Sequence, residues 1–261
     1  MCMPVTLLGR FVIDTIQEMG RIALFFSNTL LRIFAPPIKL EHLFQQIHFI
    51  GMKSLLIICL TALFTGMVLG LQGYYTLVKF GSEALLGTAV ALTLIRELGP
   101  ALTALMVTGR AGSSMAAEIG IMRISEQIDA LDTMDIEPIR FLISPKMAAC
   151  LVSFPLLTAI FDVVGIIGGY LTGVVLLGIN AGTFFTRMEM GVLMRDITGG
   201  FIKSLVFALI VATICCYQGY TTHTRRGGFG ARGVSQATTS AVVISSVLIL
   251  VSDYVLTSFL L

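Results

Sequence analysis

The stretch SLLIICLTALFTGMVLGLQGYYTLV, residues Ser54–Val78, decides the fold class of this chain of 261 residues. It holds 25 residues without a charged side chain. A helix of that length reaches roughly 37 Å at about 1.5 Å per residue, which exceeds the ~30 Å hydrocarbon core of a bilayer. The stretch therefore predicts a helix that crosses a membrane.

Four further apolar stretches lie along the chain, at residues 83–109, 147–177, 200–222 and 233–259. In the whole sequence 56% of residues are apolar and only 12% are charged, and the mean hydropathy is +0.94. So little charge does not cover the surface of a water-soluble protein. We therefore predict an all-α integral membrane protein with five transmembrane helices.

Charge and cysteine content exclude several classes of function. The net charge of +2 is spread along the chain and lacks the clustered basic face that neutralises nucleic-acid phosphates. The five cysteines are scattered, no CxxC motif is present, and the chain has three histidines. We therefore expect no nucleic-acid partner, no disulfide framework and no metal site.

The distribution of Lys and Arg predicts the orientation in the membrane. Twelve of these residues lie in the N-terminal segment and in the loops after the second and fourth spans, against three in the loops on the opposite side. Short cytoplasmic loops accumulate positive charge. The N-terminus is therefore expected in the cytoplasm and the C-terminus on the outer side.

Residues 1–45 form a segment separate from the single transmembrane domain that we assign to residues 46–261. Polar side chains of the segment project within an arc of about 100° on a helix, at Arg10, Asp14, Gln17, Glu18, Arg21, Asn28 and Arg32. This pattern predicts an amphipathic helix in the membrane interface, ended by Pro36 and Pro37. An amphipathic helix packed on protein alone is the open alternative.

Small residues recur at helical spacing in two spans. Gly66, Gly70 and Gly73 lie in the first span, and a second series lies in the third span at Gly165, Gly169 and Gly173. Such spacing lets two helix backbones approach closely. It predicts tight packing, either within one chain or between two copies.

Two opposite charges, Arg96 and Glu97, stand in the middle of the second predicted span. Charges at that depth cost several kcal/mol unless they find partners or water. Pro100 lacks the N–H that would bond to the carbonyl of Arg96, so we expect that carbonyl to be freed. The pair either lines a cavity that holds a polar headgroup or forms a buried ion pair with Lys203 or Asp162, and Lys203 alternatively extends to the interface.

The loop at residues 110–146 carries apolar side chains at helical spacing, namely Ile121, Ile124, Ile128 and Leu131. Its opposite face is mainly acidic. This pattern predicts one short amphipathic helix on the cytoplasmic side. The helix either docks a partner protein or lies on its own bundle.

Several long motifs in order carry a resemblance to a known family. They are GMVLGLQGY (66–74), LIRELGP (94–100), GRAGSSMAAEIGIM (109–122), EQIDALDTM (126–134), ISP (143–145) and GARGVSQATTSAVV (230–243). From about residue 50 to its end the chain resembles the MlaE-type permeases of ABC lipid transporters. The resemblance implies a homodimer in the bacterial inner membrane, with the C-terminus periplasmic. It also implies two partners, a cytoplasmic ABC ATPase (MlaF-like) and an MCE-domain protein (MlaD-like), and phospholipid as substrate.

The resemblance also assigns roles to residues. It places Arg96, Glu97 and Lys203 beside the lipid cavity, and it makes Leu69, Leu71, Tyr74 and Leu77 of the first span candidates for the cavity wall. It identifies residues 117–134 as a coupling helix that inserts into the ATPase, with polar positions at Glu118, Arg123, Glu126 and Gln127.

The sequence contains no GxxxxGK[ST] motif, so we expect no cofactor in this chain and ATP to be used by the partner subunit. The chain is accordingly predicted to be a permease subunit and not an enzyme. The alternative function is an ion-coupled secondary transporter of an amphiphile with Glu97 as proton carrier. Such transporters usually show internal repeats, and none is apparent at the level of whole spans.

Overall fold

The computed structural model describes residues 3–33, 40–224 and 230–260, and within these ranges it consists of helices and short turns. Five helical stretches of the described residues are long and apolar enough to cross a membrane. They are Glu41–Val78, Glu83–Ile124, Ile139–Leu176, Met194–Tyr220 and Gly230–Leu260, which we call spans one to five. The predicted all-α membrane class and its five spans are confirmed.

Short π-helical segments interrupt the first two spans and form both ends of the third. Span one comprises α2 (Leu40–Ile47), η1 (His48–Met52) and α3 (Lys53–Val78), and span two comprises η2 (Glu83–Leu85), α4 (Leu86–Thr93), η3 (Leu94–Leu98), α5 (Gly99–Val107), η4 (Thr108–Gly112) and α6 (Ser113–Ile124). Span three comprises η5 (Ile139–Ile143), α8 (Ser144–Tyr170) and η6 (Leu171–Leu176), and spans four and five are α10 (Met194–Tyr220) and α11 (Gly230–Leu260). Among the described residues, four helices lie outside the spans: α1 (Met3–Ile33), α7 (Gln127–Thr133), α9 (Ala181–Gly191) and η7 (Thr222–Thr224).

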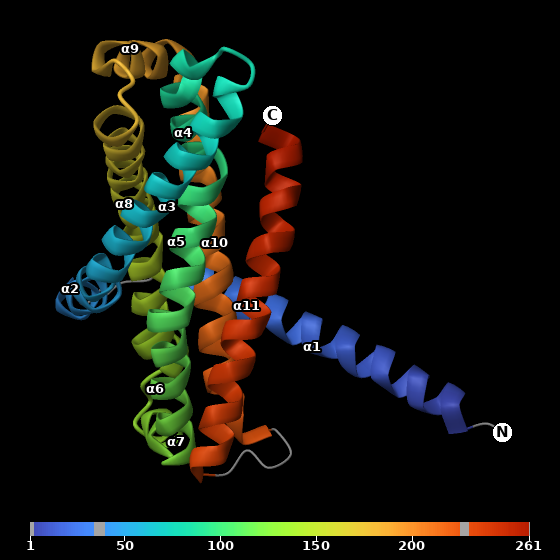
Figure 1. Ribbon diagram of the computed structural model, residues 1–261. Coiled ribbons are helices and arrows are strands. Elements are labelled where there is room, and N and C mark those ends of the chain that lie inside the picture. Colours follow the sequence, from blue (N-terminus) through green and yellow to red (C-terminus); the bar gives the residue numbers. More distant parts are fainter. Residues whose placement is uncertain (1–2, 34–39, 225–229, 261) are drawn as a thin grey trace.

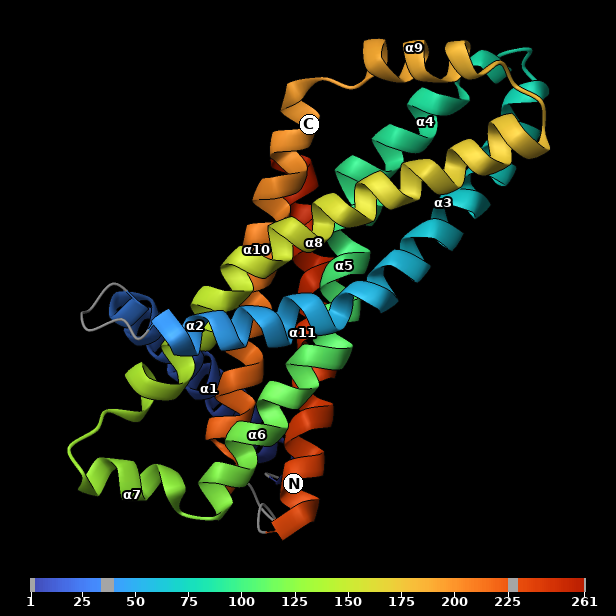
Figure 2. The same cartoon turned by 90° about the vertical axis from the view of Figure 1, so that its left-hand side faces the viewer.

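The bundle has two distinct ends. Helix α9 lies across one end, near the C-terminus, and α7 lies at the opposite end (Figure 1). We call these the α9 end and the α7 end. Figure 2 shows α3 and α8 running side by side, tilted against α10.

Glycines hold α3 directly against α8. A Cβ atom at Gly66 would collide with the backbone carbonyl of Gly165, and one at Gly70 would lie against Gly169. The absence of side chains at these positions therefore lets the two backbones meet. The predicted glycine faces serve packing within one chain.

A second close pair joins span two to span four along most of their shared length. At the α9 end, a Cβ at Gly200 would meet the carbonyl of Ile95. At the α7 end, a Cβ at Gly219 would meet the carbonyl of Ala116. We call spans two and four the two–four unit, because close backbone contacts join them near both ends of span four.

Helix α1 packs on the bundle through its C-terminal half. Phe25 is 8% exposed, and its ring stands 5.5 Å from the ring of Tyr217, in an edge-to-face arrangement. The Tyr217 hydroxyl donates to Glu18 at 3.2 Å, whereas Leu24 is 73% exposed. The described part of the helix runs to Ile33, and the predicted stop at Pro36 and Pro37 lies outside the described residues. The contact of α1 with lipid stays a prediction.

The single amphipathic helix predicted within residues 110–146 is wrong. Residues up to Ile124 continue span two as α6, and α7 begins only at Gln127. Between them Glu126 takes a left-handed conformation with φ 59°, which ends one helix and turns the chain into the next. Between spans two and three, where every residue is described, the seven residues of α7 form the one separate helix.

Candidate functional site

The LIRELGP motif forms a π-helical widening of span two, at Leu94–Leu98, followed by Pro100. Proline has no N–H, so the carbonyl of Arg96 loses its helical donor. The carbonyl accepts instead from the Lys203 ammonium, with an Nζ–O distance of 2.8 Å. The predicted freed carbonyl is confirmed, and it fastens span two to span four.

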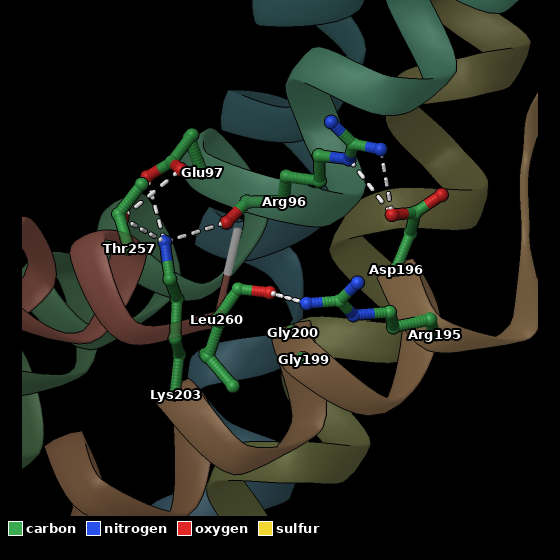
Figure 3. A pocket seen from close by; sticks show the side chains of 9 residues that line it. All are labelled: Arg96, Glu97, Arg195, Asp196, Gly199, Gly200, Lys203, Thr257 and Leu260. Atoms are coloured by element: carbon green, nitrogen blue, oxygen red, sulfur yellow. Dashed lines mark hydrogen bonds and ion pairs between the residues drawn. The ribbon is translucent and has the colours of Figure 1, made fainter.

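Lys203 lies at the centre of a network of acceptors (Figure 3). Its Nζ stands 2.7 Å from Glu97 Oε2 and 3.0 Å from Asp253 Oδ1, and it donates to Thr257 Oγ1 at 2.7 Å. The lysine side chain is 3% exposed, so it does not extend to the interface. An ammonium group this deeply buried requires such compensation. Of the predicted alternatives, the ion pair of Glu97 with Lys203 is present.

Arg96 projects to a different partner from Glu97, as neighbouring positions on a helix must. Its Nε and Nη2 lie 2.9 and 2.8 Å from Asp196 Oδ1 (Figure 3). The other oxygen of Asp196 accepts from the backbone N–H of Leu193 at 3.0 Å, which caps the start of α10. Asp162 instead packs against Gly99 of span two.

We call Arg96, Glu97, Asp196, Lys203, Asp253 and Thr257 the charged cluster. Spans two, four and five bring it together near the α9 end. Span two continues to Ile124, so its two charges lie 13 residues from one end of the span only. The central position expected from residues 83–109 is thereby corrected. Glu97 and Arg96 each keep 36% of the side chain exposed, whereas Lys203 and Asp196 are buried.

A small pocket of about 30 Å³ opens onto the charged cluster. Its lining residues are Arg96, Glu97, Arg195, Asp196, Gly199, Gly200, Lys203, Thr257 and Leu260. That volume is of the order of one or two water molecules, whereas sites for drug-sized ligands measure roughly 300–1,000 Å³. Within one chain the pocket presents charges but does not enclose a lipid.

The candidate wall residues of span one lie apart from this pocket. Leu69, Tyr74 and Leu77 are half-buried and pack against the core, and Leu71 is 42% exposed. None of the four lines the pocket, since α3 packs mainly on α8. The structure therefore brings together the three charged candidates and not the four apolar ones.

The candidate coupling residues divide into two kinds. Glu126 and Gln127 are exposed at the start of α7. Glu118 instead forms an ion pair of 2.6 Å with the buried Lys146 of α8, and Arg123 turns inward with 15% of its side chain exposed. Glu118 and Arg123 therefore have partners within the chain, but only Arg123 is largely buried, since the Glu118 side chain stays 48% exposed.

Sequence reasoning missed Asp196, Asp253 and Thr257 of the charged cluster. Asp196 falls outside the predicted fourth span, but it stands three residues after Leu193 and so had the position of a helix-capping acid. The contact of Thr257 could not be predicted from the sequence, because a threonine within an apolar stretch is common and does not indicate a polar partner.

Comparison with known proteins gives one consistent result. Residues 43–259 match the family model described as Permease MlaE. The chain is 42% identical, over 98% of its length and 97% of the relative's, to the intermembrane phospholipid transport system permease protein MlaE of Haemophilus influenzae. It is 42% identical to a probable ABC transporter permease protein of Rickettsia bellii, over 96% and 95% of the two chains. It is 36% identical to the chloroplastic protein TRIGALACTOSYLDIACYLGLYCEROL 1 of Arabidopsis thaliana, over 89% of this chain and 65% of the relative.

Proposed function

The chain belongs to the MlaE permease family, and from this premise we propose that it moves phospholipid between membranes as the transmembrane subunit of an ABC transporter. The charged cluster carries the proposal: a half-exposed guanidinium and a half-exposed carboxylate stand over a buried, fully paired lysine. Such an arrangement suits a zwitterionic or anionic headgroup in otherwise apolar surroundings.

Arg96 is the group that we assign to the headgroup phosphate. A guanidinium presents two parallel N–H donors to a phosphate, and Arg96 is accessible while its partner Asp196 is 8% exposed. Glu97 faces the same pocket and is held by Lys203, so it supplies a fixed negative charge for a headgroup amine. Lys203 itself holds the cluster together and is shielded from the lipid.

A homodimer supplies the space that one chain lacks. The pocket of about 30 Å³ is far too small for a phospholipid, and α3 carries an exposed apolar face that includes Phe64, Val68 and Leu71. In our proposal two copies enclose the acyl chains between such faces, and Leu69, Leu71, Tyr74 and Leu77 line that shared cavity.

In this proposal the free energy of ATP hydrolysis is transmitted to the chain at the α7 end. Exposed carboxylates gather on α7 and beside it, at Glu126, Asp129, Asp132, Asp135 and Glu137. We assign this acidic surface to a basic groove of a separate ABC ATPase (MlaF-like), with Glu126 and Gln127 in direct contact. The α7 end and the N-terminus then face the cytoplasm. The α9 end and the C-terminus face the periplasm and an MCE-domain protein (MlaD-like).

The first test is a tagged purification from native membranes in mild detergent, with proteins and bound lipids identified by mass spectrometry. We expect a P-loop ATPase, an MCE-domain protein and phospholipid to copurify with the chain. Recovery of the chain without an ATPase, together with amphiphile flux driven by a pH gradient, would contradict the proposal and favour an ion-coupled transporter.

A further inference from the structure

Arg123, in the last turn of α6, makes contacts within the chain. Its Nη1 lies 2.6 Å from Asp129 Oδ1, and its Nε donates to Nδ1 of His223 at 3.0 Å. Its Cζ also stands 5.3 Å from the centre of the Tyr220 ring. The guanidinium is thus occupied on three sides, and 15% of the side chain remains exposed.

These contacts join three elements. Arg123 belongs to span two, Asp129 belongs to α7, and Tyr220 and His223 belong to the end of span four and the turn after it. The backbone between α6 and α7 is bent at Glu126, so α7 has no continuous helix to hold its direction. Ile128 anchors α7 in a buried hydrophobic cluster. The planar fork of Arg123 adds a polar attachment that restricts the direction of α7, because a guanidinium binds several partners at once.

The same two spans carry the charged cluster at their other end. From Arg96 to Arg123 is about 27 residues, or roughly 40 Å of helix. Over this length Gly112 packs against Cys215, and the contacts of Gly200 and Gly219 bring the two backbones together. A displacement of α7 that is passed to both spans therefore reaches Lys203 and Glu97 through close-packed helices.

We propose that Arg123 is a positioning residue that fastens α7 to the two–four unit and transmits movement of the ATPase to the charged cluster. The inference rests on the proposed function and revises the sequence-based prediction that Arg123 is one of the polar contacts with the ATPase. Its partners in this role are Asp129 and His223. The exposed carboxylates of α7 hold the ATPase, and Arg123 determines how far α7 moves independently of the spans.

The test uses the intact complex reconstituted in proteoliposomes and measures lipid transferred per ATP hydrolysed. Arg123→Ala and His223→Ala are each expected to lower this ratio, Arg123→Ala by about tenfold, while the ATPase still copurifies. The double variant should be no worse than Arg123→Ala alone, because both changes remove one shared contact. His223→Gln, whose amide oxygen still accepts from the guanidinium, should recover most of the ratio.

Two variants serve as matched comparisons. Lys53→Ala also removes a cation from an aromatic ring, that of Phe49 at 5.2 Å, but it lies at the start of α3 and should leave the ratio unchanged. Asp132→Asn removes an exposed carboxylate from α7 and should weaken copurification of the ATPase more than the ratio.

Three results would overturn the inference. They are an unchanged ratio in Arg123→Ala, loss of the ATPase from that variant as from Asp132→Asn, and single effects that multiply in the double variant. Absence of ATP-driven lipid transfer by the unmodified complex would refute the proposed function itself, and with it this role of Arg123.

Discussion

Spans two and four carry a group of charges at each end, and the two groups differ in burial. At the α9 end, Lys203 is 3% exposed between two carboxylates, and Asp196 is 8% exposed. At the α7 end, Arg123 pairs with Asp129, which is 55% exposed. A buried charge destabilises the protein when one of its partners is lost, whereas an exposed charge is then hydrated by water at little cost. The comparison indicates that the Lys203 network holds one arrangement, whereas the Arg123–Asp129 pair exchanges more readily with water.

The largest expected effect follows the removal of the buried cation. Lys203→Met leaves Glu97 and Asp253 without their shared partner, and breaking such a pair typically costs about 3–5 kcal/mol. We expect a marked fall in thermal stability in detergent, together with loss of lipid transfer. Lys79→Met is the matched control, because Lys79 is exposed at the end of α3. Equal stability of the two variants would contradict the comparison.

Exchanging the charges of Glu97 and Lys203 tests whether the two side chains interact directly. Combining Glu97→Lys with Lys203→Glu restores opposite charges 106 positions apart along the chain. Pairwise coupling of neighbouring residues is about 0.5–3 kcal/mol, so the double variant should be more stable than either single variant by an amount in that range. Thermal unfolding of all four proteins checks this. Strictly additive losses would mean that Glu97 and Lys203 do not interact.

The connection between the two ends is tested at Gly219. A Cβ atom there would meet the carbonyl of Ala116 and the side chain of Ile119, so Gly219→Ala should separate span two from span four. Overpacking of this kind costs about 1–3 kcal/mol, and the charged cluster should also lose its response to ATP. At Gly109 no heavy atom lies within 4 Å of the same Cβ position, and Gly109→Ala should be tolerated. An equal loss of stability in Gly219→Ala and Gly109→Ala would contradict this expectation.

The smallest effect on stability is expected at the exposed pair. Asp129→Asn removes one ion-pair partner of Arg123, and exposed pairs contribute about 0.2–1 kcal/mol. Added salt should shrink this difference further, because it screens exposed charges. Unfolding at low and high ionic strength provides the measurement. A loss as large as that of Lys203→Met would show that burial does not separate the two ends.

The sequence predicted features that depend on composition and local order. The five spans followed from apolar length, and the freed carbonyl of Arg96 followed from Pro100. The glycine series predicted close packing, and α3 and α8 show that it lies within one chain.

The partners of each charge were harder to predict, because a linear pattern gives depth along a helix but not the direction in which neighbouring helices face. Asp253 meets Lys203 from 50 positions away, and Thr257 meets Glu97 from 160 positions away. The break before α7 depends on a left-handed Glu126, for which a glutamate gives no local signal. The burial of Lys203 was not predicted for the same reason. Its position near the start of a span does not show which neighbouring helices cover the side chain.

The central claim is that ATP hydrolysed by a partner drives phospholipid past the charged cluster. The direct measurement is transfer of labelled phospholipid between donor and acceptor vesicles by the reconstituted complex, with and without ATP. We predict transfer that requires ATP and is lost in a complex with Glu97→Gln, while the ATPase remains bound. Transfer that proceeds without ATP under a pH gradient, or that persists unchanged in Glu97→Gln, would contradict the account.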